Sequence, residues 1–354
     1  MFREEVKWSS FEIRSVFRRE VNFREGVAKA SKVVDAIVMG GGGFWELWPE
    51  DYWSGTSLDL DPRFLESLGK PVFFNALGVD DGRGIERHAG QNFGVLLEHL
   101  LADPRYLVSV RNDGSLGTLS NHFGVSAGSV LESPDHGFFA PDFVANGGAP
   151  ISGPYIAVSL AQDMPNFRFR GGFTSDGLIA QIAESIEALV EETDLSFALV
   201  PHIYSDLDIY AGLLRALSDK TRREKMIVMP LQTTQNTDHS AVDTYRNANL
   251  SWTMRFHASA LAIGAGVPTI GLLSYPKVRS IFADSSKFRG FGVEVSNGNF
   301  ANALVDLSLE SLAAGREDRM APISDTSRFR QELEIARSAV ANSLRVWAEH
   351  NNLA

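Results

Sequence analysis

The chain of 354 residues is longer than one hydrophobic core usually supports, so its length predicts two domains. Apolar residues make up 44% and charged residues 22%, which is typical of a globular protein. The net charge of −11 argues against a surface that coats nucleic acid, and the lack of cysteine excludes disulfides, thiolate metal sites and cysteine nucleophiles. No apolar run reaches the roughly 18 residues of a membrane span. Residues 1–25 carry charges throughout, unlike a signal peptide, so we expect a soluble, cytoplasmic protein.

The first half of the chain alternates buried strands with helices. Residues 11–32 are amphipathic and favour a helix. Strands are expected at 33–39, 70–79 and 106–110, and helices at 90–102 and from about 115 to 123. Repeated strand–loop–helix units imply a parallel sheet that is covered on both faces. Residues 140–153 are rich in Gly, Pro and Ala without periodicity and predict a linker between a domain of residues 1–150 and one of residues 151–354.

A run of four glycines, Gly40 to Gly43, follows the first expected strand. Glycine after a strand lets another backbone or a ligand approach closely. The run is no dinucleotide-binding fingerprint, since Trp45 stands where its last glycine would fall, and no Gly-Lys-Ser/Thr of a P-loop follows. Both readings therefore remain open: a plain turn, or a loop in which Gly42 and Gly43 face a ligand.

Three tryptophans, Trp45, Trp48 and Trp53, lie close together in the next stretch. Indole rings offer flat apolar faces with a polar edge, which suits the apolar faces of sugar rings. We therefore expect them to bind a saccharide, with a loop that packs on its own domain as the alternative.

The second half repeats the α/β pattern. Strands are expected at 155–160, 196–202, 226–229, 250–254, 269–273 and 291–295, and helices at 175–192, 207–218, 256–265, 301–312 and 327–350. Two such halves in series predict two Rossmann-like α/β domains that face each other across a cleft. The last helix is a candidate to cross back and brace the first domain.

The stretch from Asn249 to Lys277 carries the strongest functional signal. A strand leads into a turn with Arg255 and His257, and a helix and a second strand precede Lys277. In such a βαβ unit, strand carboxyl ends and the helix amino end meet at the ligand crevice, where free N–H groups and the helix dipole attract an anion. The alternative is a surface salt bridge for Arg255 and a helix cap for His257.

Three more polar residues stand at expected strand ends. Arg111 ends the strand at 106–110, and His202 ends the strand at 196–202 with Asp206 just beyond. Arg111 either contributes to the anion site from the first domain or forms a structural ion pair. His202 either serves a phosphate or sugar hydroxyl or bonds to backbone, and Asp206 is either a general base or a helix cap.

Taken together, these motifs resemble the polysaccharide pyruvyl transferase family. The resemblance rests on Arg255-Phe256-His257, Gly266-Val267-Pro268 and Tyr275-Pro276-Lys277, with weaker matches at Gly41–Phe44, Arg111–Ser115, Asp135 and Phe138. The sequence departs from the family where Phe256 replaces Leu and Asn112 replaces Asp, in residues 75–81, which lack a Pro, and in the opening residues.

The resemblance implies a glycosyltransferase-B-like fold and the transfer of pyruvate from phosphoenolpyruvate to two hydroxyls of a sugar, forming a cyclic ketal. Expected donor-binding residues are Arg255, Phe256, His257, Lys277, Arg111 and His202. Catalysis is expected from His257 as acid, with Arg255 and with Asp206 as base. The expected acceptor-binding residues are Trp45, Trp48, Trp53, Gly42, Gly43 and Ser115.

No metal or cofactor is expected, and the acceptor is either a saccharide or a lipid-linked oligosaccharide. No nucleic-acid partner is expected, and the sequence carries no signal for an oligomeric state. Two other functions remain open. One is a glycosyltransferase that uses a nucleotide sugar, with Asp284 as the nearest candidate to bind a donor ribose. The other is a non-catalytic saccharide-binding relative.

Overall fold

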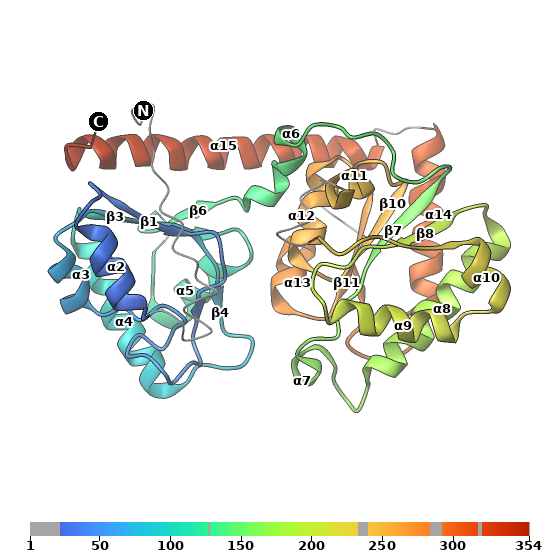
Figure 1. Ribbon diagram of the computed structural model, residues 1–354, viewed down its shortest axis with the longest axis horizontal. Helices are drawn as coiled ribbons and strands as arrows, with labels where there is room; N and C mark the ends of the chain where they lie inside the picture. The colour runs from blue at the N-terminus through green and yellow to red at the C-terminus, as the bar shows by residue number, and fades with distance from the viewer. Residues whose placement is uncertain (1–21, 127, 233–239, 284–291, 318–320, 354) are drawn as a thin grey trace. The chain divides into compact units, whose positions relative to one another are not determined.

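The computed structural model describes residues 22–126, 128–232, 240–283, 292–317 and 321–353 of the chain (Figure 1). Part of the helix expected at 11–32 lies outside these residues, and so does Asp284. Among the helices that the structure describes, none combines the length and hydropathy needed to cross a membrane.

The described residues form two compact units. One contains the residues up to Asp135 and those from Leu333 onwards, and the other is His136–Glu332. The second unit therefore begins at His136 and not after residue 150, and the predicted linker of residues 140–153 belongs to it. The reason is local packing, because Phe138 lies edge-to-face against Phe256 of the second unit, with ring centroids 6.5 Å apart.

The first unit is built on a parallel four-stranded sheet with the strand order β1-β3-β5-β6. Its strands are β1 (Ile37–Gly40), β3 (Val72–Leu77), β5 (Tyr106–Arg111) and β6 (Leu131–Ser133), and a small parallel pair is formed by β2 (Trp45–Glu46) and β4 (Val79–Asp80). The helices are α2 (Phe23–Ser31), α3 (Pro62–Leu68), α4 (Arg87–Ala102) and α5 (Ser115–Phe123).

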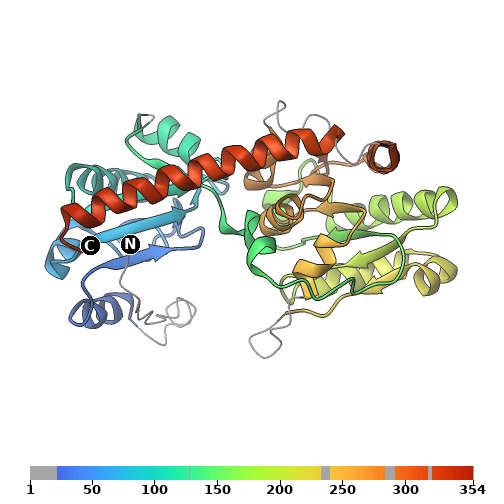
Figure 2. The ribbon, with the colours of Figure 1, turned by 90° about the horizontal axis from the view of Figure 1, so that it is seen from above.

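The C-terminal part of α15 (Ala321–His350) belongs to the first unit and packs on its sheet (Figure 2). Trp347 packs against Phe73 of β3, with ring centroids 6.3 Å apart, and its Nε1 donates a hydrogen bond of 3.0 Å to the carbonyl of Arg105. The other face of β3 presents Val72 and Phe74 to the core formed with α4. The expectation that the last helix returns to the first unit is confirmed, since alternate β3 residues need cover on both faces.

The second unit contains a parallel six-stranded sheet with the order β12-β11-β10-β7-β8-β9. Its strands are β7 (Tyr155–Ser159), β8 (Ser196–Leu199), β9 (Met226–Val228), β10 (Leu250–Thr253), β11 (Thr269–Leu273) and β12 (Gly292–Glu294). The chain starts at central β7, moves outward to β9, and returns beside β7 as β10. This is the strand order of the doubly wound Rossmann fold, and it places a topological switch point between β7 and β10.

Helices cover both faces of this sheet. They are α7 (Pro165–Arg168), α8 (Ser175–Glu192), α9 (Asp206–Ala216), α10 (Asp219–Glu224), α11 (Ser240–Arg246), α12 (Phe256–Gly264), α13 (Pro276–Ala283) and α14 (Ala301–Glu317), and η1 (His136–Phe138) and α6 (Ala140–Phe143) precede β7. Ile156 and Val158 pack into the core with α8, α9 and α14, whereas Tyr155 and Ala157 face α11 and α12. This alternation follows from the two-residue period of a strand.

Candidate functional site

The predicted residues of the second unit gather at the carboxyl edge of its sheet. Arg255 follows β10 and Asp163 follows β7, so both lie at the switch point where ligands of such folds bind. Asp206 and His202 follow β8, the other neighbour of β7. The site therefore combines the βαβ motif predicted from the sequence with the loops that follow β7 and β8.

Arg255 is the centre of this edge, and two carboxylates hold its guanidinium. Nε donates to Oδ2 of Asp206 at 3.0 Å, and Nη2 donates to Oδ1 of the same carboxylate. Nη2 also donates to Oδ1 of Asp163 at 2.7 Å. The residue precedes α12 in extended conformation without capping it through its side chain. The sequence left two interpretations of Arg255 open, an anion-binding cation and a salt bridge. The structure shows two carboxylate partners for it.

The carboxylate of Asp206 connects Arg255 to the loop after β8. Its side chain has no exposed surface, and its Oδ2 also accepts hydrogen bonds from the backbone N–H groups of His202 (2.9 Å) and Ile203 (3.1 Å). A carboxylate that is buried and bonded in this way is an anchor for the loop and for Arg255. Both oxygens being engaged, this geometry favours anchoring over the predicted role of general base.

Asp163 links Arg255 to a second arginine. Arg168, which is 4% exposed, donates from Nη2 to Oδ2 of Asp163 at 3.2 Å and from Nε to the Asp163 carbonyl at 2.7 Å. Its Nη1 donates to Oγ of Ser274, after β11, at 3.2 Å. Burial opposes the charged form of the Asp163 carboxyl, but the positive charges of Arg168 and then Arg255 outweigh it. They hold the pKa of Asp163 below its usual value. The sequence analysis did not single out Asp163 or Arg168. Asp163 could have been found from its position, because it is an acidic residue shortly after a buried strand.

His202 lies beside Arg255 as a neutral imidazole. Its Nε2 is 2.8 Å from Oη of Tyr245, which is fully buried. Burial, and then the positive charge of Arg255, lower the pKa of His202 to about 4. With its pKa lowered in this way, the imidazole is uncharged at neutral pH and offers a phosphate no electrostatic attraction. It can still offer or accept a hydrogen bond.

His257 and Lys277 lie at the same edge of the sheet as Arg255. His257 is exposed in the first turn of α12, and Lys277 is half-buried in the first turn of α13, which follows β11 beside β10. Phe256, predicted to contact the donor, is only 8% exposed and packs edge-to-face on Phe138. It therefore belongs to the core under the site.

In the first unit, Arg111 forms buried ion pairs with two carboxylates. It is 4% exposed, donates to Asp113 from Nε (2.8 Å) and Nη2 (2.6 Å), and donates to Asp135 from Nη1 (3.2 Å). Ser115, also fully buried, accepts a hydrogen bond of 2.7 Å from the backbone N–H of Val79. These contacts bind the ends of β4, β5 and β6 together, so the structural alternative for Arg111 holds, and Ser115 is closed to an acceptor.

The tryptophans predicted to bind a saccharide have different environments. Trp45 is fully buried against Phe74 and Phe93, with ring centroids at 5.6 and 5.2 Å, so it is a core residue. Trp48 is half-buried with the guanidinium of Arg83 5.1 Å from its ring, and Trp53 is 39% exposed. A sugar can reach only these last two.

The glycine run serves close backbone packing. A Cβ on Gly40 would lie 2.3 Å from the carbonyl oxygen of Asn75, and the carbonyl of Gly42 accepts a hydrogen bond of 2.9 Å from Gly78. A Cβ on Gly78 would in turn lie 3.0 Å from Cα of Gly43 and 2.9 Å from Nη2 of Arg111. Close backbone packing is therefore enough to explain the glycines at positions 42 and 43 without a ligand.

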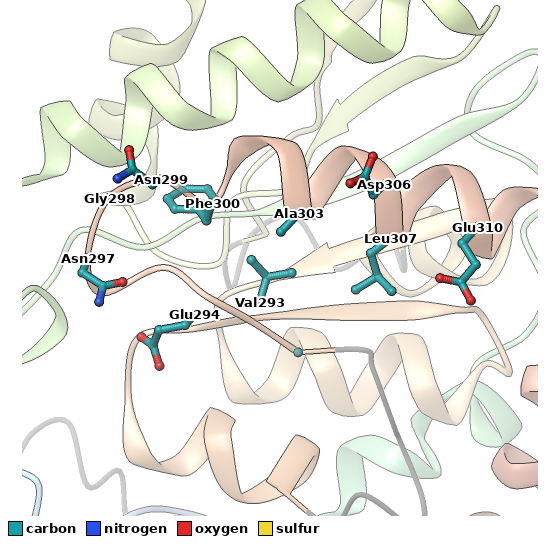
Figure 3. Close-up of a pocket in the computed structure, with 11 residues that line it drawn as sticks. Val293, Glu294, Asn297, Gly298, Asn299, Phe300, Ala303, Asp306, Leu307 and Glu310 are labelled. Carbon is teal, nitrogen blue, oxygen red and sulfur yellow. The ribbon is translucent and has the colours of Figure 1, made fainter.

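A cavity of about 540 Å³ lies along the edge of the second unit's sheet, between β12 and α14 (Figure 3). Glu294, Asp306 and Glu310 line it together with apolar side chains such as Leu307 and Phe300. Its acidic lining would repel an anion. The cavity is therefore a poor match for the anionic donor that the sequence predicted.

Comparison with known proteins gives a family. A sequence model of polysaccharide pyruvyl transferases matches residues 3–275 of the chain. No protein with curated annotation matches the sequence.

Solved structures resemble the fold. A UDP-forming α,α-trehalose-phosphate synthase from Burkholderia xenovorans is 12% identical with a TM-score of 0.52, covering 92% of this chain and 78% of the other. The MnaA–UDP structure from S. aureus is 11% identical with a TM-score of 0.54, covering 95% and 80%. The UDP-GlcNAc 2-epimerase of Methanocaldococcus jannaschii is 12% identical with a TM-score of 0.51, covering 88% and 80%. At such identity the likeness concerns the fold alone, and it confirms the predicted glycosyltransferase-B-like class of two Rossmann-like units.

Proposed function

Because the chain belongs to the polysaccharide pyruvyl transferase family, an enzyme family, we propose that it transfers pyruvate from phosphoenolpyruvate to two hydroxyls of one sugar residue. The product is a cyclic pyruvate ketal on a saccharide, and inorganic phosphate is released. The observation that carries the proposal is the position of Arg255 and His257 at the amino end of α12, at the switch point of the sheet.

The donor presents a phosphate and a carboxylate on a three-carbon skeleton, and it needs cations with directed donors. An arginine offers five N–H groups in a planar arrangement that suits bidentate contact with such anions. Next to Arg255, which is paired with Asp206 and Asp163, Lys277 and the first-turn N–H groups of α12 add positive potential at the same edge of the sheet. These features support a donor site in the second unit.

The chemistry takes two protons from the sugar hydroxyls and delivers two, one to the methylene carbon and one to the leaving phosphate. The methylene of the donor takes a proton, and the oxygen of the first sugar hydroxyl bonds to the central carbon and loses its proton. The bond between that carbon and the phosphate oxygen then breaks, and the phosphate leaves with a proton. The second hydroxyl adds to the same carbon, losing its own proton, and closes the ketal ring.

His257 is our assignment for the acid that binds the phosphate and protonates the donor. An imidazole can both give and take a proton, so an exposed histidine suits proton transfer in either direction. Asp206 holds Arg255 in place, and His202, kept neutral, is available for a hydrogen bond to a sugar hydroxyl. Trp53 and Trp48 remain the candidates for stacking on the acceptor.

Incubation of the protein with phosphoenolpyruvate and a panel of glycosides tests the proposal. We expect phosphate release that depends on the acceptor, and a product with the mass of one pyruvate ketal. Calorimetric titration provides the second arm, in which phosphoenolpyruvate binds saturably and uridine diphosphate does not. Binding of the nucleotide alone would instead favour a glycosyltransferase. Binding of a saccharide without turnover of phosphoenolpyruvate would favour a non-catalytic relative.

A further inference from the structure

The guanidinium of Arg255 has two faces that can each bind an oxyanion with two parallel hydrogen bonds. One is formed by Nε–H with one Nη2–H, and the other by the second Nη2–H with Nη1–H. Asp206 takes the first face completely. Asp163 takes the Nη2 position of the second face, and no described residue accepts a hydrogen bond from Nη1.

The two carboxylates differ in how firmly they are held. Asp206 has no exposed surface and four donors, two of them backbone N–H groups. The Asp163 side chain is 26% exposed, and among the described residues its carboxylate bonds to the two arginines alone. Moving Asp206 would break the loop after β8, whereas moving Asp163 costs one hydrogen bond to Arg255.

Arg168 is a second ion-pair partner for the Asp163 carboxylate. Its Nη2 lies 3.2 Å from Oδ2 and 3.5 Å from Oδ1 of Asp163, and it is anchored independently through Ser274 and the Asp163 carbonyl. The carboxylate can therefore leave Arg255 and stay paired with Arg168, so the exchange leaves no buried charge without a partner.

We propose that Asp163 is an internal competitor for the donor: in the free protein its carboxylate occupies half of the Arg255 face that binds an oxyanion of phosphoenolpyruvate. On donor binding, the Nη2–H···Oδ1 bond to Asp163 is exchanged for a bond to the donor, and Nη1 completes the bidentate contact. Asp163 thus sets the affinity for the donor through Arg255 and is a positioning residue. This inference rests on the proposed function for the identity of the anion, but its geometry concerns any small oxyanion.

Replacing Asp163 with Asn in the full chain tests the inference, because the amide keeps the shape and removes the competing charge. Calorimetric titration with phosphoenolpyruvate should give a dissociation constant lower by about tenfold, equivalent to about 1.4 kcal/mol. The KM for phosphoenolpyruvate should fall by a similar factor. A carboxylate that merely orients Arg255 predicts the opposite change, a higher KM, and that result or an unchanged affinity overturns the inference.

The matched control is Asp194→Asn, which removes an exposed carboxylate paired with Lys225 at the amino edge of the same sheet. It corrects for the general gain in anion affinity when a negative charge is lost, and we expect no more than a twofold change.

Inorganic phosphate, titrated in parallel, separates this inference from the proposed function. Tighter phosphate binding by Asp163→Asn, in a protein that neither binds nor turns over phosphoenolpyruvate, supports the inference and refutes the function. Turnover of phosphoenolpyruvate with unchanged affinity for both anions does the reverse. Absence of anion binding in every variant overturns the inference.

Discussion

Arg255 and Asp206 are joined by two side-by-side hydrogen bonds, Nε–Oδ2 at 3.0 Å and Nη2–Oδ1, although they lie 49 positions apart in the chain. The pair joins the loop after β8 to the turn after β10 across β7, which lies between them in the sheet. It therefore fixes the orientation of the arginine before any ligand arrives.

Replacing Asp206 with Asn should destabilise the protein and reduce turnover together. The change leaves Arg255 with one carboxylate partner and removes the charge of a side chain that has no exposed surface. Loss of a buried partner of this kind costs about 3 kcal/mol. Urea unfolding measures the loss. Asp208→Asn, an exposed residue in the same first turn of α9, should change stability by less than about 1 kcal/mol. Equal stability of the two variants would contradict the anchoring role.

Replacing His257 with Ala should lower turnover with phosphoenolpyruvate by about 10²–10⁴-fold, the usual contribution of general acid–base catalysis. Because His257 is exposed, the free energy of unfolding should change little. Phosphate release under saturating donor and acceptor measures the effect, with His350→Ala, an exposed histidine of α15, as control. Near-wild-type turnover would remove His257 from the mechanism.

The stability of the protein should fall as the pH decreases from about 6.5 towards 4. Burial and Arg255 lower the pKa of His202 to about 4, so in this range the unfolded chain takes up a proton that the folded protein refuses. The expected loss between pH 7 and pH 5 is about 2 kcal/mol, from an unfolded pKa of about 6.5. Above about pH 8 both states are neutral at this residue, and the contribution is constant.

Urea unfolding of His202→Gln across the same pH range isolates this effect, because glutamine keeps a hydrogen-bonding side chain and does not titrate. The variant should lose less stability between pH 7 and pH 5 than the wild type. If both lose the same amount, His202 does not have its pKa lowered in the folded protein.

Trp53→Ala and Trp45→Ala should have separable consequences. Trp53 is 39% exposed, so its loss should raise the KM for the acceptor while the KM for phosphoenolpyruvate and the stability stay close to wild type. Trp45 is fully buried between aromatic rings, and its removal should cost about 3–5 kcal/mol. An unchanged acceptor KM in Trp53→Ala would remove the indole from the acceptor site.

The sequence alone determined the α/β architecture, because runs such as residues 155–160 and 269–273 are buried strands on composition and the intervening helices have a clear period and clear caps. It also predicted that Arg255, His257 and Lys277 share one edge of a sheet, since a βαβ unit fixes that relation locally. Short elements were missed: α13 begins at Pro276 and has only 8 residues, too few for a helical period to stand out in the sequence.

Only the tertiary structure decided what those side chains contact. Asp163, Arg168 and Asp206 stand on loops after β7 and β8, and strand order, which depends on long-range packing, brings them to Arg255. Burial likewise distinguishes Trp45, which is in the core, from Trp53, which is exposed, although both are tryptophans of one short stretch. Local sequence encodes period, caps and turns, whereas charge partners and exposure depend on which strands become neighbours.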